Sequence, residues 1–218
     1  MEFKEFIKEN SRITDEELKK FFPEKLEKKW LEKALGKAEF KLDEKTISKS
    51  LAEPIWDFLS RGGKRWRPTL MLLSYEALGG KNRKKFLPLT VLPELLHNGS
   101  IMVDDIEDSS ELRRGKKCTH LIFGQDIAIN AGNAMYFLPF ILLYRNTLSL
   151  NDTTIRKIYD LCSLEMMRLS AGQGMDILWH KENQEHLTEE HYLQMCAYKT
   201  GALARLSAKL GGILAEAK

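Results

Sequence analysis

The chain has few cysteines and no marked excess of charge. Its three cysteines, Cys118, Cys162 and Cys196, have no metal-ligand spacing and leave an odd thiol. We interpret them as structural and expect a reducing compartment, the cytoplasm. The 34 basic residues nearly match the 31 acidic ones, which gives a formal net charge of +3. Charge alone therefore indicates neither nucleic-acid binding nor membrane binding.

Long hydrophobic runs and strand patterns are also lacking. The longest apolar run, residues 137–144, is too short to span a bilayer, and the N-terminus lacks the apolar core of a signal peptide. We therefore expect no stable membrane anchor. Apolar residues instead recur at helical spacing throughout, which predicts an all-α fold. At 218 residues with 43% hydrophobic content, one domain is the natural count.

The helical pattern is interrupted at Gly62-Gly63, Gly79-Gly80, Arg114-Gly115 and Leu150-Asn151-Asp152, where glycine frees the backbone or Asn and Asp can cap the next helix. It predicts helices at residues 3–10, 15–35, 44–60, 66–78, 84–102 continuing into an acidic cluster, 126–148, 152–172 and 188–216. Pro68 is expected in the first turn of its helix, where a missing N–H costs nothing. Pro93 and Pro139 fall inside apolar helical runs, so we expect kinks there.

The acidic cluster places four acids in five positions, at Asp104, Asp105, Glu107 and Asp108. Asp104 and Asp108 share one helix face with Asp105 beside them, and like charges at this spacing cost roughly 0.2–0.5 kcal/mol per pair. The alternative is a solvated acidic helix end. Because residues 91–103 are too apolar to lie open on a surface, we favour a cation site where a buried helix meets a cavity. Oxygen ligands without nearby His or Cys favour Mg²⁺.

Further motifs accompany this cluster in a fixed order. They are Gly62-Gly63-Lys64-Arg65-Trp66-Arg67-Pro68, His97 to Asp108 with Leu112-Arg113-Arg114-Gly115, Gly172-Gln173-Gly174-Met175-Asp176, and Tyr198-Lys199-Thr200-Gly201-Ala202-Leu203. With them, residues 40–218 resemble the trans-isoprenyl diphosphate synthases (polyprenyl synthetases), most of all the geranylgeranyl diphosphate synthases. The resemblance implies an isoprenoid synthase helical bundle around a central cavity. It also implies Mg²⁺-dependent condensation of isopentenyl diphosphate with an allylic diphosphate.

The resemblance assigns the acidic cluster and the following arginines to diphosphate binding. Asp104 and Asp108 would hold the Mg²⁺ ions that bridge the leaving diphosphate. Asp105 would be a supporting ligand or a hydrogen-bond acceptor behind the ligands. Arg113 would contact the allylic diphosphate and Arg114 the diphosphate of isopentenyl diphosphate. Planar forked donors suit phosphate oxygens, so lysine would not replace either arginine conservatively.

The isopentenyl diphosphate pocket is expected to contain Lys64, Arg67 and His97. For His97 alone, a satisfied core histidine is the alternative, and for Lys64 alone, a surface lysine. His97 lies seven residues before Asp104, two helical turns away on one face, which favours the ligand role. Arg65 we interpret as structural.

Lys199 and Thr200 resemble the family's pair that reaches the allylic diphosphate and stabilises the cation. Gly201 would loosen the helix and free the carbonyl of Thr200. Gln173 and Asp176 are three apart and are expected to face inward. Gln173 is a candidate substrate ligand, and Asp176 a candidate acceptor for metal-bound water. A polar helix-packing contact is the alternative for this pair.

Gly99 and Ser100 precede Asp104 by five and four positions. We expect these small residues to leave the path of the growing tail open, so that products reach geranylgeranyl length or longer.

The family's second aspartate-rich motif is absent from residues 1–218. We therefore expect a single partial isoprenoid synthase domain, completed by a second polypeptide that carries this motif, and we allow for homodimerisation. A trimmed chain and a non-catalytic regulatory subunit are alternatives. A class I terpene cyclase is another, although a cyclase would not need the isopentenyl diphosphate pocket.

Overall fold

The computed structural model describes residues 3–182 and 186–216, and nearly all its regular structure is helical. The first half contains α1 (Phe3–Phe21), α2 (Lys28–Leu35), α3 (Glu44–Ile47), the π-helix η1 (Ser48–Ala52), α4 (Glu53–Leu59), α5 (Trp66–Ala77), α6 (Arg83–Phe86), the 3₁₀-helix η2 (Leu87–Thr90) and α7 (Val91–Glu107). The second half contains β1 (Leu112–Arg113), β2 (Lys116–Lys117), α8 (Thr119–Phe123), α9 (Gln125–Phe137), the 3₁₀-helix η3 (Leu138–Phe140), α10 (Ile141–Tyr144), α11 (Asp152–Lys181), α12 (Glu189–Lys199) and α13 (Gly201–Leu214). The predicted all-α class is confirmed.

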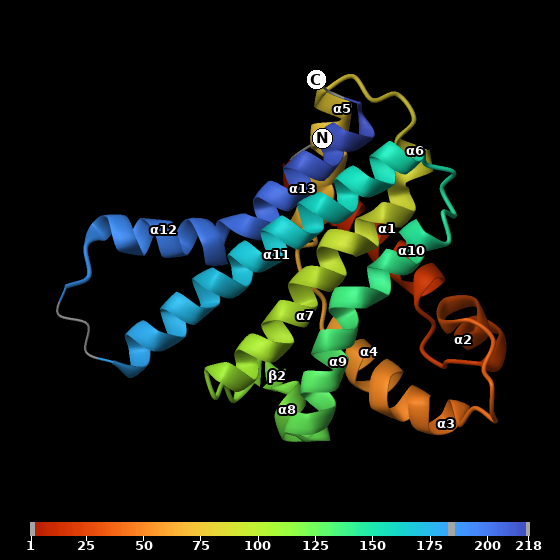
Figure 1. Ribbon diagram of the computed structural model, residues 1–218, viewed down its shortest axis with the longest axis horizontal. Coiled ribbons are helices and arrows are strands. Elements are labelled where there is room, and N and C mark those ends of the chain that lie inside the picture. Colours follow the sequence, from red (N-terminus) through yellow and green to blue (C-terminus); the bar gives the residue numbers. More distant parts are fainter. Residues whose placement is uncertain (1–2, 183–185, 217–218) are drawn as a thin grey trace.

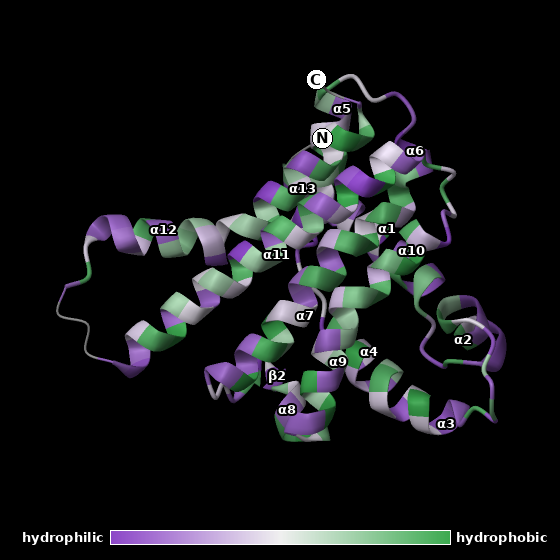
Figure 2. Cartoon of the chain, in the orientation of Figure 1, coloured by the Kyte–Doolittle hydropathy of each residue, from purple (hydrophilic) through white to green (hydrophobic). Residues whose placement is uncertain are grey.

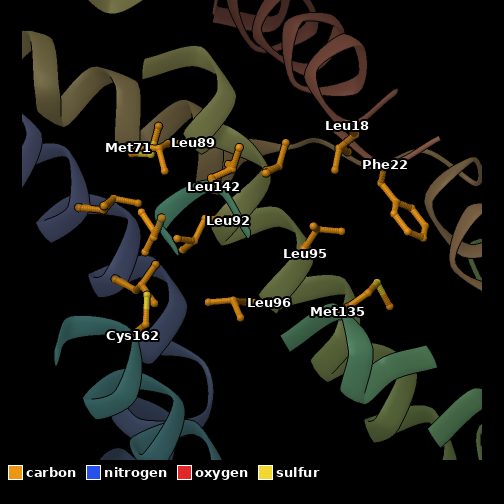
Figure 3. Close-up of a cluster of buried hydrophobic side chains, with 14 of the residues drawn as sticks. Leu18, Phe22, Met71, Leu89, Leu92, Leu95, Leu96, Met135, Leu142 and Cys162 are labelled. Atoms are coloured by element: carbon orange, nitrogen blue, oxygen red, sulfur yellow. The ribbon is translucent and has the colours of Figure 1, made fainter. Parts of the chain in front are cut away.

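Helix α7 lies at the centre of the bundle, and α11 and α12 extend from it as a hairpin arm (Figure 1). Helix α9 packs along α7, while α13 packs against α5 and α11. Apolar side chains of α7 form the middle of the core, where Leu95 and Leu96 lie between Met135 of α9 and Cys162 of α11 (Figure 3). This burial keeps α7 fixed while its C-terminal end carries the acidic cluster.

The predicted break after residue 10 is wrong, because α1 continues to Phe21. Two buried polar side chains inside α1 bond to its own backbone. Asn10 Nδ2 donates to the carbonyl of Phe6 at 2.8 Å, and Thr14 Oγ1 donates to that of Asn10 at 3.1 Å. The helix ends instead before Pro23, so the helix predicted over residues 15–35 is divided.

Other boundaries also differ from the prediction. Helix α11 extends beyond residue 172 to Lys181, and the helix predicted over 188–216 is divided at Thr200. Pro93 is the third residue of α7, in its first turn, so it causes no interior kink. Pro139 does interrupt its helical run, as a 3₁₀ segment between α9 and α10.

A short hairpin, which the sequence did not predict, follows α7. Leu112 pairs with Lys117 and Arg113 with Lys116, and the turn between them consists of Arg114 and Gly115. Both turn residues are left-handed, with φ of 52° and 77°, which suits a tight antiparallel hairpin. The hairpin therefore reverses the chain immediately beside the acidic cluster.

By length and composition alone, one stretch of the described residues could cross a membrane. Residues Gln125–Tyr144 have a mean hydropathy of 1.5 and are 39% buried. This stretch is longer than the apolar run at 137–144 considered from the sequence. Its residues Ala128, Ala131 and Met135 are buried in the core.

Candidate active site

A cavity of about 440 Å³ lies beside the C-terminal half of α7. It is lined by Arg67, His97, Ser100, Ile101, Val103, Asp104, Glu107, Tyr136, Leu169, Ser170, Gln173, Gly174, Ile177, Lys199, Thr200 and Leu203. Aliphatic walls with a few convergent polar groups are typical of small-molecule sites. The polar groups form two sets, one around Asp104 and one around Arg67.

The set around Asp104 joins three helices. Gln173 Nε2 on α11 donates to Asp104 Oδ1 and to Glu107 Oε2, each at 2.8 Å. Lys199 Nζ on α12 lies 3.4 Å from Asp104 Oδ1 and also donates to Asp176. The structure thus brings together four side chains that sequence patterns had predicted separately, and it adds Glu107.

Lys199 remains a cation in this setting. Burial favours its neutral form, but the hydrogen bond to Asp176 and the charge of Asp104 outweigh burial and raise the pKa of Lys199. Asp108 is the residue that follows α7. It is largely exposed and does not line the cavity. Partial burial and the neighbouring charge of Asp104 raise the pKa of Asp108. The carboxylates at this end outnumber Lys199, so negative charge remains to be neutralised.

Gly172 explains why α11 and α12 come this close. A Cβ at Gly172 would overlap the backbone of Lys199, and it would also crowd Tyr198. Only glycine permits this approach, which sets Lys199 beside Gln173. A glycine within an otherwise helical segment was the available signal for such a contact.

Asp105 points away from the cavity. Its side chain is 1% exposed, and its Oδ1 accepts from Arg113 Nε at 2.7 Å. Asp104 and Asp105 differ by about 100° in direction around α7, yet Arg113 lies near both, with its Nη2 4.0 Å from Asp104 Oδ2. Neither Asp105 nor Arg113 lines the cavity, and their predicted ligand roles stay predictions. Within residues 3–182 and 186–216, no three His, Cys, Asp or Glu side chains converge as a metal cage.

The second polar set is cationic. Arg67 Nη1 and His97 Nε2 are 2.9 Å apart, and the guanidinium of Arg67 stacks 4.5 Å from the ring of Trp66. Burial lowers the pKa of Arg67 to about 10. Burial and the charge of Arg67 lower the pKa of His97 to about 3, so His97 is neutral at pH 7 and its Nε2 accepts from Arg67. Arg67 Nε is buried and has no hydrogen-bond partner among the described residues, so one donor of this guanidinium is unsatisfied.

Two other predicted ligands lie outside the cavity. Arg114 Nη2 donates to Asn98 Oδ1 at 3.0 Å, and its Nη1 donates to the carbonyl of Gly62. Burial lowers the pKa of Arg114, and the charge of Arg65 adds to the effect. Lys64 is exposed and lines a separate cavity of about 780 Å³ beside α1. The predicted isopentenyl diphosphate pocket is therefore divided, with only Arg67 and His97 on the central cavity.

Sequence comparison places the chain among known proteins. It matches the family model for polyprenyl synthetase over residues 48–218. It is 35% identical over 173 residues to the geranylgeranyl diphosphate synthase of Saccharolobus solfataricus, covering 79% of this chain and 51% of that protein. It is 33% identical over 166 residues to the geranylgeranyl pyrophosphate synthase of Eremothecium gossypii, covering 76% and 51%. The chain spans about half the length of the curated relatives it matches.

Solved structures give a consistent result. The geranylgeranyl pyrophosphate synthetase from Pyrococcus horikoshii superposes with a TM-score of 0.80 at 29% identity, covering 98% of this chain and 58% of that one. The geranylgeranyl pyrophosphate synthetase from Geoglobus acetivorans gives a TM-score of 0.78 at 28% identity, covering 95% and 60%.

Proposed function

Since the chain belongs to the polyprenyl synthetase family, we propose that it forms the core of a Mg²⁺-dependent prenyltransferase. The reaction would condense isopentenyl diphosphate with an allylic diphosphate to give geranylgeranyl diphosphate or a similar prenyl diphosphate. One observation carries this proposal. A single cavity is lined both by a carboxylate–lysine set and by a half-buried arginine, Arg67, that has no carboxylate partner among the described residues, which suits two different diphosphates.

The residues present fit Mg²⁺. Asp104, Asp108 and Asp176 could hold it, because oxygen ligands suit this ion and Lys199 does not neutralise them all. A closed protein cage is not required, since Mg²⁺ usually binds through one or two carboxylates together with substrate phosphates. When bound, it would neutralise charge on the leaving diphosphate.

The chain's own side chains would bind and orient the allylic substrate. Lys199 would bind the allylic diphosphate, while Gln173 would hold Asp104 in place through the hydrogen bond at 2.8 Å. Thr200, at the junction of α12 and α13, would turn its carbonyl toward the allylic cation. The aliphatic walls would exclude water from that cation, and charge interactions are stronger where water is excluded.

Arg67 and His97 would bind isopentenyl diphosphate without a metal. This substrate must keep its diphosphate while its double bond attacks the cation, so a purely cationic pocket suits it. A terpene cyclase would have no use for this second anion site. We also propose that activity requires a further polypeptide, and that the protein works in the cytosol, as its free cysteines suggest.

Replacing Asp104 tests the proposal. In the completed enzyme, we expect Asp104→Ala to lower kcat/KM by about 100-fold or more, the scale of losing one transition-state charge contact of about 2.7–4 kcal/mol. Asp160→Ala is the matched control, because Asp160 is an exposed acid on α11 whose ion pair, within the described part of the chain, is with the exposed Arg156. Turnover by Asp104→Ala within a few fold of wild type would show that the carboxylate assignment is wrong.

A further inference from the structure

Helix α1 lies outside the segment that the family model matches, yet it touches the loop between α4 and α5. Ser11 Oγ donates to the carbonyl of Gly63 at 3.2 Å. Asp15 Oδ1 accepts from Arg65 Nε at 2.9 Å. Ser11 and Asp15 are four residues apart, so they share one face of α1 and both reach the same loop.

The hydrogen bonds of Arg65 fix this loop. Its backbone is left-handed, with φ of 45°, a conformation that non-glycine residues keep only when their surroundings impose it. Its guanidinium is bonded on each side: Nε to Asp15, Nη1 to Glu94 Oε1 at 2.7 Å, and Nη2 to the carbonyl of Leu59 at 2.8 Å. Of these partners only Asp15 comes from outside α4, α5 and α7 and their connections.

The bonds of Arg65 continue toward the other arginines. Glu94 Oε1 also accepts from Asn98 Nδ2 at 2.6 Å, and Asn98 Oδ1 accepts from Arg114 Nη2 at 3.0 Å. Arg114 in turn donates to the carbonyl of Gly62, which closes the network on the loop. Helix α7 therefore holds one side of the loop and α1 holds the other.

We propose that α1 is a positioning element for anion binding, and that Asp15, assisted by Ser11, holds the Gly62–Arg65 loop in its anion-binding conformation. Arg67 follows the loop by two residues, so a shift of Arg65 moves Arg67 with it. Among the described residues, the hydrogen bond and ion pair of Asp15 are with Arg65, which does not line the central cavity. The proposal rests on the proposed role of Arg67 as an anion ligand.

This role is separate from the packing of α1. Leu18 and Phe22 bury their side chains in the core and anchor the C-terminal end of α1 (Figure 3). The side chain of Asp15, in contrast, is 44% exposed. Removing the charge of Asp15 should therefore leave the fold intact. Only the Gly62–Arg65 loop should become more mobile when this charge is removed.

The test compares Asp15→Asn with Asp15→Glu and with Glu16→Gln in the full chain. Glu16 is the adjacent acid, and its contact is a pair with Arg12 at 3.9 Å on the same helix. The measurements are amide hydrogen exchange of residues 60–67 and calorimetric binding of inorganic pyrophosphate without added metal. For Asp15→Asn we expect about tenfold faster loop exchange and about tenfold weaker pyrophosphate binding, as for one charge-assisted hydrogen bond. Asp15→Glu should recover part of both, and Glu16→Gln should change neither.

Unchanged loop exchange in Asp15→Asn would overturn the proposal, as would faster exchange with unaltered pyrophosphate affinity. If wild type does not bind pyrophosphate, the proposed anion site at Arg67 fails, and loop exchange alone then decides whether α1 holds the loop. Should Asp15→Asn melt at a clearly lower temperature than wild type, Ser11→Ala replaces it. That variant removes one hydrogen bond to the same loop and is expected to speed exchange at residues 62–64.

Discussion

At the scale of single residues, direction around a helix decides which small residue of α7 meets the substrate. Ser100 lines the central cavity. Gly99 does not, because a Cβ there would meet the carbonyl of Gly132 at 2.8 Å and the Cβ of Met135 at 3.0 Å. The expectation that both residues keep the tail path open is therefore corrected for Gly99, which instead permits close packing of α7 on α9. Ser100 alone retains the predicted role.

We predict that Ser100→Phe shortens the product. A phenyl ring at this position would fill part of a cavity of about 440 Å³ below Asp104 and block the growing tail. The completed enzyme should change from geranylgeranyl or longer products to shorter ones, as measured by chromatography of the dephosphorylated alcohols. Ser100→Ala should leave chain length unchanged. If Ser100→Phe has the wild-type product distribution, the tail takes another path.

His97 should make the fold sensitive to acid. Its pKa is about 3 in the folded chain and roughly 6.5 when unfolded, so between these values the unfolded state binds the extra proton. Protonation of His97 therefore does not lower the free energy of unfolding above the unfolded-state pKa. Below that pKa, the free energy of unfolding falls as the pH drops, by up to about 1.4 kcal/mol per pH unit.

Urea unfolding of wild type and His97→Gln at pH 7 and pH 5 checks this. Wild type should lose up to about 2 kcal/mol more than the variant over this interval, because glutamine does not titrate. The carboxylates titrate in both proteins, so their contribution to the change in stability cancels in the comparison. Equal losses in the two proteins would show that His97 is not held neutral by its surroundings.

Residue types and helical spacing predicted Asp104 and the inward direction of Gln173, and the family resemblance added Lys199. The structure brings these three side chains together. They could not predict the direction of Asp105. Its ion pair with Arg113 depends on the hairpin after α7, whose short strands leave almost no periodic signal. Glu94 was also missed, although a charged residue within an apolar run is a signal for a buried ion pair.

At the scale of helices, the contact between α11 and α12 depends on one glycine of a pair. Gly172 faces the backbone of Lys199, whereas a Cβ at Gly174 would meet nothing within 4 Å. We predict that Gly172→Ala destabilises the chain by about 1–3 kcal/mol, the usual cost of overpacking. Gly174→Ala should be neutral or stabilising by up to about 1 kcal/mol, because alanine favours helix.

Thermal unfolding of both variants distinguishes the two positions. Displacement of α12 should also move Lys199, so Gly172→Ala should weaken pyrophosphate binding in the presence of Mg²⁺ more than Gly174→Ala does. Equal melting temperatures for the two variants would mean that α11 and α12 can separate without cost.

Helix boundaries show where sequence patterns fail. The sequence pattern predicted a break after residue 10, yet Asn10 and Thr14 bond to carbonyls one turn earlier and α1 continues. Periodicity likewise predicted one helix over 188–216, but it cannot detect the local change of direction at Thr200. The break at Arg114–Gly115 was predicted correctly, because left-handed turn residues have a strong composition signal.

At the scale of the whole molecule, the arm formed by α11 and α12 exposes apolar surface. Met167 and Leu178 of α11 are 68% and 48% exposed, and Tyr192 and Leu193 of α12 are 58% and 57% exposed. Hydrophobic residues recur along both helices of this arm (Figure 2). The arm also carries Gln173, Asp176 and Lys199, so whatever covers it would lie next to the proposed diphosphate site.

We predict that residues 1–218 alone have little synthase activity and that a helical polypeptide carrying a further carboxylate cluster covers this arm. Association would bury the apolar surface and place negative charge across the cavity from Asp104, where a second metal could be held. Apparent stability should rise with partner concentration.

Pull-down from native lysate, followed by an assay of synthase activity with and without the captured chain, tests this prediction. Tyr192→Lys with Leu193→Lys should abolish capture, whereas Phe40→Lys, at a site that is 87% exposed and outside the arm, should not. Full synthase activity from pure residues 1–218 would rule the partner out.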